Sequence, residues 1–246
     1  MEGGTNLNGS EQTLVFYSAT ADFRTCDPVM NLHPNDWNVV IIGYWNLAIL
    51  SPAGIANRLF HVAEDTPIEV LVALDGVAPI QAKYEGITVI PDDKRLVVGP
   101  VVATAQNMER AKKISAEALK ALPQTPVHAV GVNFRYVGST IDADDEFLKL
   151  LKHDSDDSLS DAEFQIVARS HSRSIRWKEG VLNISLTTDD ENTCKVLFNF
   201  ELKSTDVNAL ISWLAQPVEE FLSVVKTLIS DYLSSEAGTI EEAANV

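Results

Sequence analysis

Cysteine is the rarest residue in this 246-residue chain, which contains only Cys26 and Cys194. Neither has a second cysteine within a few positions, so the spacing argues against a disulfide framework and against a cysteine-based zinc site. The five histidines show no HExxH or HxH pattern, which is the usual signature of a zinc or iron centre. We therefore expect a protein of a reducing compartment that uses no metal and no other cofactor.

Long apolar runs and catalytic motifs are also missing. No segment approaches the roughly 18 consecutive apolar residues that a membrane span needs, and no apolar stretch of signal-peptide length follows Met1. The chain has no G-x-S-x-G elbow of a serine hydrolase and no phosphate-binding P-loop. These absences predict a cytoplasmic protein without membrane contact, and they favour a non-enzymatic function.

Positive charge is in short supply. The chain has 19 Lys and Arg residues against 35 Asp and Glu residues, which gives a formal charge of −16. Because such a surface repels phosphate backbones and anionic membranes, we do not expect direct nucleic-acid binding. The simplest interpretation is that the charge keeps the protein soluble. Two sharper ones are an acidic surface that docks on a protein partner, and an acidic nucleic-acid mimic that inhibits a DNA-binding protein.

What the chain does contain is one pattern that occurs twice. Lys83-Tyr84-Glu85-Gly86-Ile87 leads to Asp92-Asp93, and Trp177-Lys178-Glu179-Gly180-Val181 leads to Asp189-Asp190. Both stretches predict a strand, a Glu-Gly turn, a strand, an acidic turn and a third strand that leads into a helix. Self-similarity at a long period indicates a duplicated architecture.

Hydrophobic periodicity and turn residues place the other elements around this pattern. In the first half we expect a strand near 37–45, a helix begun by Ser51-Pro52, strands near 68–74, 78–84, 87–90 and 95–101, and a helix over 106–122. In the second half we expect a strand over 127–137, a short helix over 144–151, an acidic loop over 154–161, strands near 164–170, 171–177, 181–186 and 194–202, and a last helix from 205 or 206 to 233, bent or restarted at Pro217.

The order strand, helix, four strands, helix, twice over, resembles the fold of the TATA-box-binding protein family. The resemblance implies an α+β protein in which two pseudo-repeated β-α-β4-α halves, residues 36–123 and 124–235, form a curved antiparallel sheet with two long helices on one face. Residues 1–35 are expected to be a flexible extension with a short strand at 14–17, and residues 236–246 a disordered tail. Only the topology is similar: no functional motif of that family is present, so no functional residue carries over.

The first candidate site is a basic stretch, Arg169 to Lys178. Side chains alternate on a strand, so Arg169, His171 and Arg173 are expected on one face, where they would suit an anionic ligand. One alternative is a solvated strand that balances nearby acidic turns. Another is a small-molecule or phosphate-ester enzyme in which this row holds an anion and a carboxylate from elsewhere acts as base.

The second candidate site is the apolar stripe of the last helix. Its members recur three and four residues apart, and the interface candidates are Ile211, Leu214, Phe221, Leu228 and Tyr232. The stripe either packs on the chain's own sheet or meets a partner, which includes a second copy in a homodimer. Taken together, the sequence favours a protein-binding platform or a subunit of a larger complex.

Overall fold

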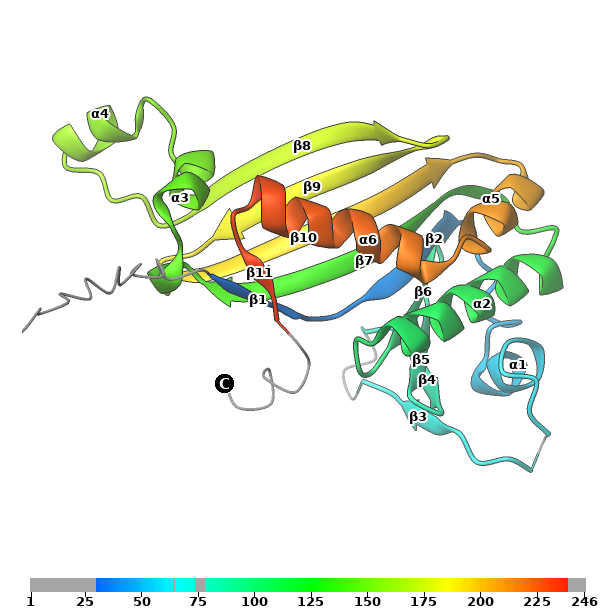
Figure 1. Cartoon of the computed structure of the whole chain (residues 1–246). Coiled ribbons are helices and arrows are strands. Elements are labelled where there is room, and N and C mark those ends of the chain that lie inside the picture. Colours follow the sequence, from blue (N-terminus) through cyan, green and yellow to red (C-terminus); the bar gives the residue numbers. More distant parts are fainter. Residues whose placement is uncertain (1–29, 64, 74–77, 239–246) are drawn as a thin grey trace, which may run out of the picture.

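A computed structural model of the chain describes residues 30–63, 65–73 and 78–238. Over these residues the protein is an α+β structure with one large sheet of eleven strands and six α-helices, as the sequence predicts for the fold class (Figure 1). The strands are β1 (Asn31–Pro34), β2 (Asn38–Gly43), β3 (Glu69–Leu71), β4 (Gln81–Tyr84), β5 (Ile87–Pro91), β6 (Arg95–Pro100), β7 (Val127–Ser139), β8 (Arg169–Trp177), β9 (Gly180–Thr188), β10 (Thr193–Lys203) and β11 (Glu236–Ala237). The helices are α1 (Pro52–Arg58), α2 (Ala105–Ala121), α3 (Asp145–Leu151), α4 (Asp156–Asp161), α5 (Val207–Leu214) and α6 (Val218–Thr227), with a 3₁₀ turn at Thr140–Asp142 and a π-helical turn at Leu228–Tyr232.

The antiparallel pair of β2 and β7 lies at the centre of the sheet. The strand order of the sheet is β3-β4-β5-β6-β2-β7-β10-β9-β8, and all of these neighbours are antiparallel. The register of the central pair places Asn38 opposite Asn133. Two strands lie off this path: β1 pairs with the far end of β7, and β11 pairs with β1 in the parallel direction. One sheet therefore contains both occurrences of the repeated pattern.

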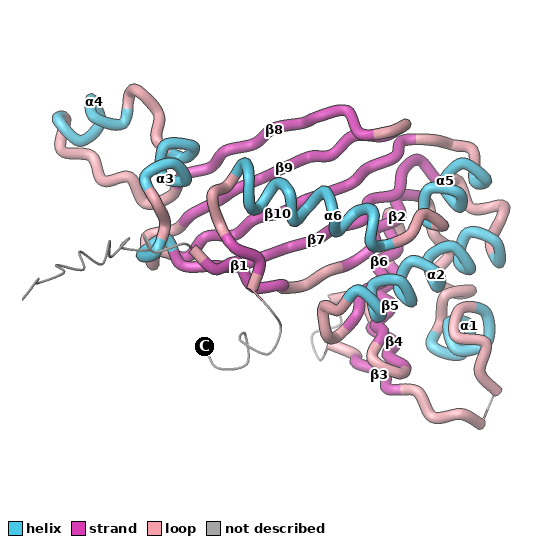
Figure 2. Tube along the Cα trace, viewed as in Figure 1, coloured by secondary structure: helices cyan, strands magenta, loops and turns pink. Residues whose placement is uncertain are grey.

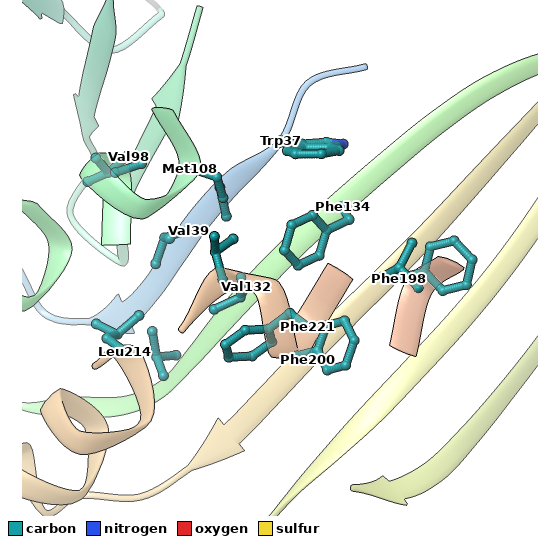
Figure 3. Packing of buried hydrophobic residues seen from close by; sticks show 14 of the residues in the cluster. Trp37, Val39, Val98, Met108, Val132, Phe134, Phe198, Phe200, Leu214 and Phe221 are labelled. Carbon is teal, nitrogen blue, oxygen red and sulfur yellow. The ribbon is translucent and has the colours of Figure 1, made fainter. Parts of the chain in front are cut away.

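Helices cover one face of this sheet. Figures 1 and 2 show α2, α5 and α6 lying together across one face, while α3 and α4 stand at one end beside the start of β8. Alternate strand residues point under the helices and form the core, which includes Val39, Val132, Phe134, Phe198 and Phe200 (Figure 3). The ring of Phe221, on α6, lies 5.1 Å from that of Phe200, edge to face. No helix of the described chain lies on the opposite face, which we call the uncovered face. None of the described helices is both long and apolar enough to span a bilayer.

Local sequence signals account for the helix boundaries. Ser51 accepts a hydrogen bond from the Gly54 amide, with Pro52 as the first helical residue, so α1 begins as predicted. Asp206 caps α5 in the same manner. The last helix stops at Leu214 and restarts at Val218, which confirms the break predicted at Pro217.

An ion pair from α2 joins the two sides of this break. The Lys112 ammonium donates to the Gln216 carbonyl and to Glu109 Oε2, at 2.9 Å for the carboxylate. The same carboxylate oxygen accepts from the Val218 amide at 3.2 Å. Lys112 is fully buried, with its ammonium 5.1 Å from the centre of the Phe221 ring. A lysine and a glutamate one helical turn apart thus satisfy a carbonyl and an amide that Pro217 leaves without helical partners.

Three predicted elements differ in the second half. A single strand, β8, begins at Arg169, and residues 164–168 form no strand, so three strands lie between α4 and α5 instead of the predicted four. The acidic stretch expected as a loop forms α4 instead, with Asp156 and Asp157 in its first turn, where the helix dipole favours negative charge. The second tight turn uses Lys178 and Glu179, because Gly180 already pairs with Trp177, whereas the first uses Glu85 and Gly86. The two Glu-Gly motifs are therefore offset by one residue.

The two ends of the described chain lie next to each other. Residues 31–34, placed by sequence in the flexible extension, form β1, and Met30 and Leu32 are buried in the core. The Glu236 amide donates to the Met30 carbonyl at 3.0 Å, and the Gly238 amide donates to the Leu32 carbonyl at 2.9 Å. The disordered tail predicted over 236–246 is wrong at its start, because Glu236 and Ala237 pair with β1 as β11. Residues 239–246 lie outside the described residues, as does the strand predicted at 14–17.

Candidate functional site

The uncovered face is polar where it is formed by β7, β8, β9 and β10. Because Leu182, Ile184 and Leu186 point into the core, the residues between them on β9 point to the uncovered face. Following the register across neighbouring strands gives hydroxyl, amide and charged groups around one apolar side chain, Leu197: Ser170, Ser172 and Ser174 on β8, Asn183, Ser185 and Thr187 on β9, Lys195, Asn199 and Glu201 on β10, and Asn133 and Arg135 on β7.

Four asparagines form a continuous hydrogen-bonded chain across this face. Asn183 Nδ2 donates to Asn199 Oδ1 at 2.9 Å, Asn199 Nδ2 to Asn133 Oδ1 at 2.7 Å, and Asn133 Nδ2 to Asn38 Oδ1 at 2.9 Å. The Ser174 hydroxyl donates to Asn183 Oδ1 at 2.7 Å, which extends the chain to the edge strand. We call this set the asparagine row. Every member sits directly opposite the next one in the strand register, so the row crosses β8, β9, β10, β7 and β2.

The asparagine row is held rigidly in place. Asn38 and Asn133 are each 5% exposed, and the row meets Gly131, where an added Cβ would lie 2.6 Å from Asn199 Nδ2. A carboxamide can donate two hydrogen bonds and accept two, and each bond within the row uses only part of that capacity. The row therefore fixes its donors and acceptors at the strand spacing of about 4.8 Å, with Asn183 and Asn199 partly exposed and Asn38 and Asn133 buried.

A shallow hollow of about 250 Å³ lies on the same face beside the row. Its lining includes Arg135, Lys195, Ser185 and Thr187. Arg135 pairs with Asp36 at 2.7 Å, and the Lys195 ammonium lies 3.8 Å from Asp189. Exposed pairs of this kind contribute at most about 1 kcal/mol each, so both cations can exchange partners.

The predicted anion-binding residues share a strand side, but their polar ends have different partners. Arg169 Nε donates to Asp156 Oδ2 at 3.1 Å, His171 Nε2 lies 2.7 Å from the Tyr232 hydroxyl, and Arg173 donates to the Ser172 carbonyl at 2.9 Å. A hollow of about 670 Å³ beside α3 is lined by Arg169, but neither His171 nor Arg173 belongs to its lining. The structure therefore does not bring the three polar ends together around one pocket.

His171 joins three elements instead. Its ring bonds Tyr232, in the π-helical turn, and the Leu150 carbonyl, on α3. Burial lowers the pKa of His171, the Arg173 guanidinium lowers it further, and the Leu150 carbonyl opposes both. The neutral ring is thus favoured, in a position that ties β8 to α3 and to the end of the last helix.

The predicted interface residues lie on the chain's own core. Phe221 is fully buried, Leu214 is 2% exposed, and the remaining candidates, Ile211, Leu228 and Tyr232, pack against the core while partly exposed. This is the core-packing alternative, and it leaves Leu214 and Phe221 covered by their own chain. Tyr232 belongs instead with His171, which the sequence placed in a separate candidate site.

Two further observations concern metal and thiol chemistry. Within the described part of the chain, no three His, Cys, Asp or Glu side chains gather closely enough to hold a metal ion. Cys194 is buried, and burial raises the pKa of its thiol to about 12, so it is not a reactive thiolate at neutral pH. Cys26 lies outside the described residues.

Comparison with known proteins adds no family assignment: no protein-family model matches the chain, and no curated protein matches it.

Proposed function

We propose that this protein is a non-enzymatic binding platform, or a subunit of a larger complex, that holds a protein partner against the uncovered face. The observation that supports this most directly is the asparagine row. Its side chains are already fixed by one another, so a partner that bonds to them orders few additional rotamers on binding. Asn183 and Asn199 are the partly exposed members of the row, and the hydrogen-bonding capacity that they retain on a rigid sheet suits a polar protein surface.

The charge distribution favours a protein over a nucleic acid as the partner. The chain as a whole carries −16, and the two cations beside the row, Arg135 and Lys195, each have an acidic neighbour. A phosphate backbone needs a continuous row of unopposed cations, because its binding depends on counterion release. The uncovered face supplies hydrogen-bonding groups instead.

We also propose that the sheet consists of two duplicated halves arranged as in the TATA-box-binding protein family. Outward from the centre, the strand order is β2-β6-β5-β4-β3 on one side and β7-β10-β9-β8 on the other. On each side, the strand that comes first in the chain, β2 or β7, lies at the centre of the sheet. Its outer neighbour is the strand that comes last in that half, β6 or β10. Superposition of residues 38–121 on residues 127–214 tests this proposal, which fails if the corresponding strands do not align.

Affinity purification from the native host tests the platform. Ser185→Arg places a long cation on the uncovered face, and Ser223→Arg makes the same change at an exposed position of α6, on the helical side. We expect a protein that is captured by the wild type and by Ser223→Arg but lost with Ser185→Arg, with thermal unfolding used to verify that both variants fold. A partner that all three proteins capture equally well contradicts binding at the uncovered face.

A further inference from the structure

Strand β8 forms one edge of the sheet and is paired on one side only. It is nine residues long, pairs with β9 along its whole length, and ends the strand order (Figure 1). In an antiparallel ladder, backbone groups point alternately toward the neighbouring strand and away from it. Trp177 and Gly180 close the two-residue turn, so the residues whose amides and carbonyls face away are Ser170, Ser172, Ser174 and Arg176. The Ser172 carbonyl accepts a hydrogen bond from the Arg173 guanidinium, as expected for a carbonyl outside the ladder.

The same strand has an unusual charge for this protein. Residues 169–178 contain four Lys or Arg residues and no carboxylate, in a chain of formal charge −16. Arg169 pairs with Asp156, and Lys178 pairs with Glu220. Arg173 and Arg176 are exposed, and neither forms an ion pair with an acid of the described residues. Alternation places Arg173 on the helical side and Arg176 on the uncovered side, so a neighbouring strand would meet a cation on both faces.

We infer that β8 is a docking edge for an extended acidic segment of a partner protein, which adds to the sheet as a further antiparallel or parallel strand. Main-chain hydrogen bonds to the outward groups of β8 provide affinity, and carboxylates opposite Arg173 and Arg176 provide selectivity. This inference rests on the proposed platform function and gives its partner a place and a chemistry.

Charge also argues against two alternatives, which are a second copy of the protein docked at β8 and an acidic strand docked at β3. A second copy that paired β8 with β8 would bring the arginines of both copies together, and like charges opposite each other destabilise a strand pair. At the opposite end of the strand order, β3 has only three residues, and the side chains of Val70 and Leu71 are exposed there without any arginine or lysine on the strand. An acidic strand therefore fits β8 better than it fits β3. It also fits β8 better than a second copy of β8 does.

Synthetic peptides provide the first test. The probe, called the Glu-Val peptide, has nine residues with Glu at every third position and Val between, so that successive carboxylates lie on opposite faces of the extended strand. The controls are the same peptide with Lys in place of Glu and an acidic peptide with Pro in place of Val. We expect the Glu-Val peptide alone to bind, more weakly as salt rises, and to slow hydrogen exchange at the amides of Ser170, Ser172, Ser174 and Arg176. The proline peptide retains the charge but lacks the alternating donors, so binding of both acidic peptides would show attraction without strand addition and overturn the inference.

Variants of the protein provide the second test. Arg173→Glu with Arg176→Glu should weaken the Glu-Val peptide about tenfold, because two attractive pairs become repulsive. The charge-matched control, Lys113→Glu with Lys226→Glu on exposed positions of α2 and α6, should leave the affinity unchanged. Ser172→Pro removes one outward amide without a change of charge, at a site where an edge strand tolerates proline, and should also abolish binding. If that variant does not fold, the arginine pair still decides the outcome.

Failure of this inference is distinguishable from failure of the platform. A Glu-Val peptide that does not bind, or that protects amides of β7 and β10 but not those of β8, overturns strand addition at β8. The platform is judged separately by the loss of a captured protein with Ser185→Arg, a residue on β9, one strand in from the outer edge, whose replacement leaves both arginines of β8 in place.

Discussion

Replacement of Glu109 by glutamine is expected to destabilise the protein although the residue is partly exposed. Glutamine keeps an oxygen that can accept from the Val218 amide, but it removes the one carboxylate of the described residues that bonds the buried ammonium of Lys112. Removal of one partner from a buried pair costs about 3–5 kcal/mol. The Gln216 carbonyl and the Phe221 ring still contact the ammonium, so we expect the low end, about 3 kcal/mol.

The double variant makes the test sharper. Lys112→Met leaves the Gln216 carbonyl without its donor and should cost about 1–2 kcal/mol. In Glu109→Gln with Lys112→Met no charge is buried, so the combined loss should be about 2 kcal/mol smaller than the sum of the single losses. Urea unfolding followed by tryptophan fluorescence measures all three, with Lys113→Met on the exposed side of α2 as the control. Additive losses, or a Glu109→Gln variant as stable as the wild type, would refute the role assigned to this pair.

The same pair predicts how the penalty depends on pH. Burial lowers the pKa of Lys112 below 10.5, and the Glu109 carboxylate opposes that shift, so Glu109→Gln should lower the pKa further. Between the folded-state pKa and 10.5 the unfolded chain binds a proton that the folded chain does not, so this group's contribution favours the folded state more as pH rises. The destabilisation by Glu109→Gln should therefore shrink as pH rises toward 10.5, and an unchanged penalty would contradict a buried charge.

Three other predictions use stability measurements. Asn133→Leu should cost about 1–3 kcal/mol in urea unfolding, because it leaves two amide neighbours in the asparagine row without their partner. Gly180→Ala should lower the free energy of unfolding by about 1–3 kcal/mol through overpacking, since its Cβ would lie 2.8 Å from the ring of Trp213. Gly86→Ala has open space around the added Cβ but a φ of 77°, so it should cost only about 1 kcal/mol. Equal losses for the two variants would contradict the packing argument. His171→Gln should flatten the decline in stability as pH falls below 6.5, because the pKa of His171 is lowered on folding and the unfolded chain takes up the proton first; an unchanged slope would assign that decline to other groups.

Local signals were sufficient to predict most of the elements. Ser51 and Pro52 start α1, Pro217 breaks the last helix, and the periodicity over 106–122 places α2 within one residue at each end. These signals act over a few neighbouring residues, so the sequence around each position contains them. The fold class and the antiparallel pairing followed from the short connections between strands.

The errors arose where a partner in space decides the outcome. Phe164, Ile166 and Ala168 alternate as a strand would, yet residues 164–168 have no strand to pair with, and a strand without a partner leaves its backbone groups unsatisfied. The burial of Lys112 has no local signal either, because the carbonyl to which its ammonium donates belongs to Gln216, 104 residues further along the chain.

The candidate site was missed for the same reason. The asparagine row joins residues 38, 133, 183 and 199, and only the strand register shows that they are neighbours. One signal was present in the sequence: asparagine is depleted in strands, so asparagines within four predicted strands indicate a specific role. The anion-site residues were correctly placed on one side of a strand, but the sequence could not show that Tyr232, Asp156 and a backbone carbonyl engage them separately.

The parallel pair of β1 and β11 makes the connectivity of this chain unusually easy to rearrange. Since the Gly238 amide donates a hydrogen bond to the Leu32 carbonyl, a linker of a few residues could join residue 238 to residue 30. New termini could then be opened in an exposed turn such as Glu85-Gly86. Conversely, a truncation before residue 236 would remove β11 and expose the apolar side chains of Met30 and Leu32. The two-residue strand β11 therefore contributes to the burial of this part of the core.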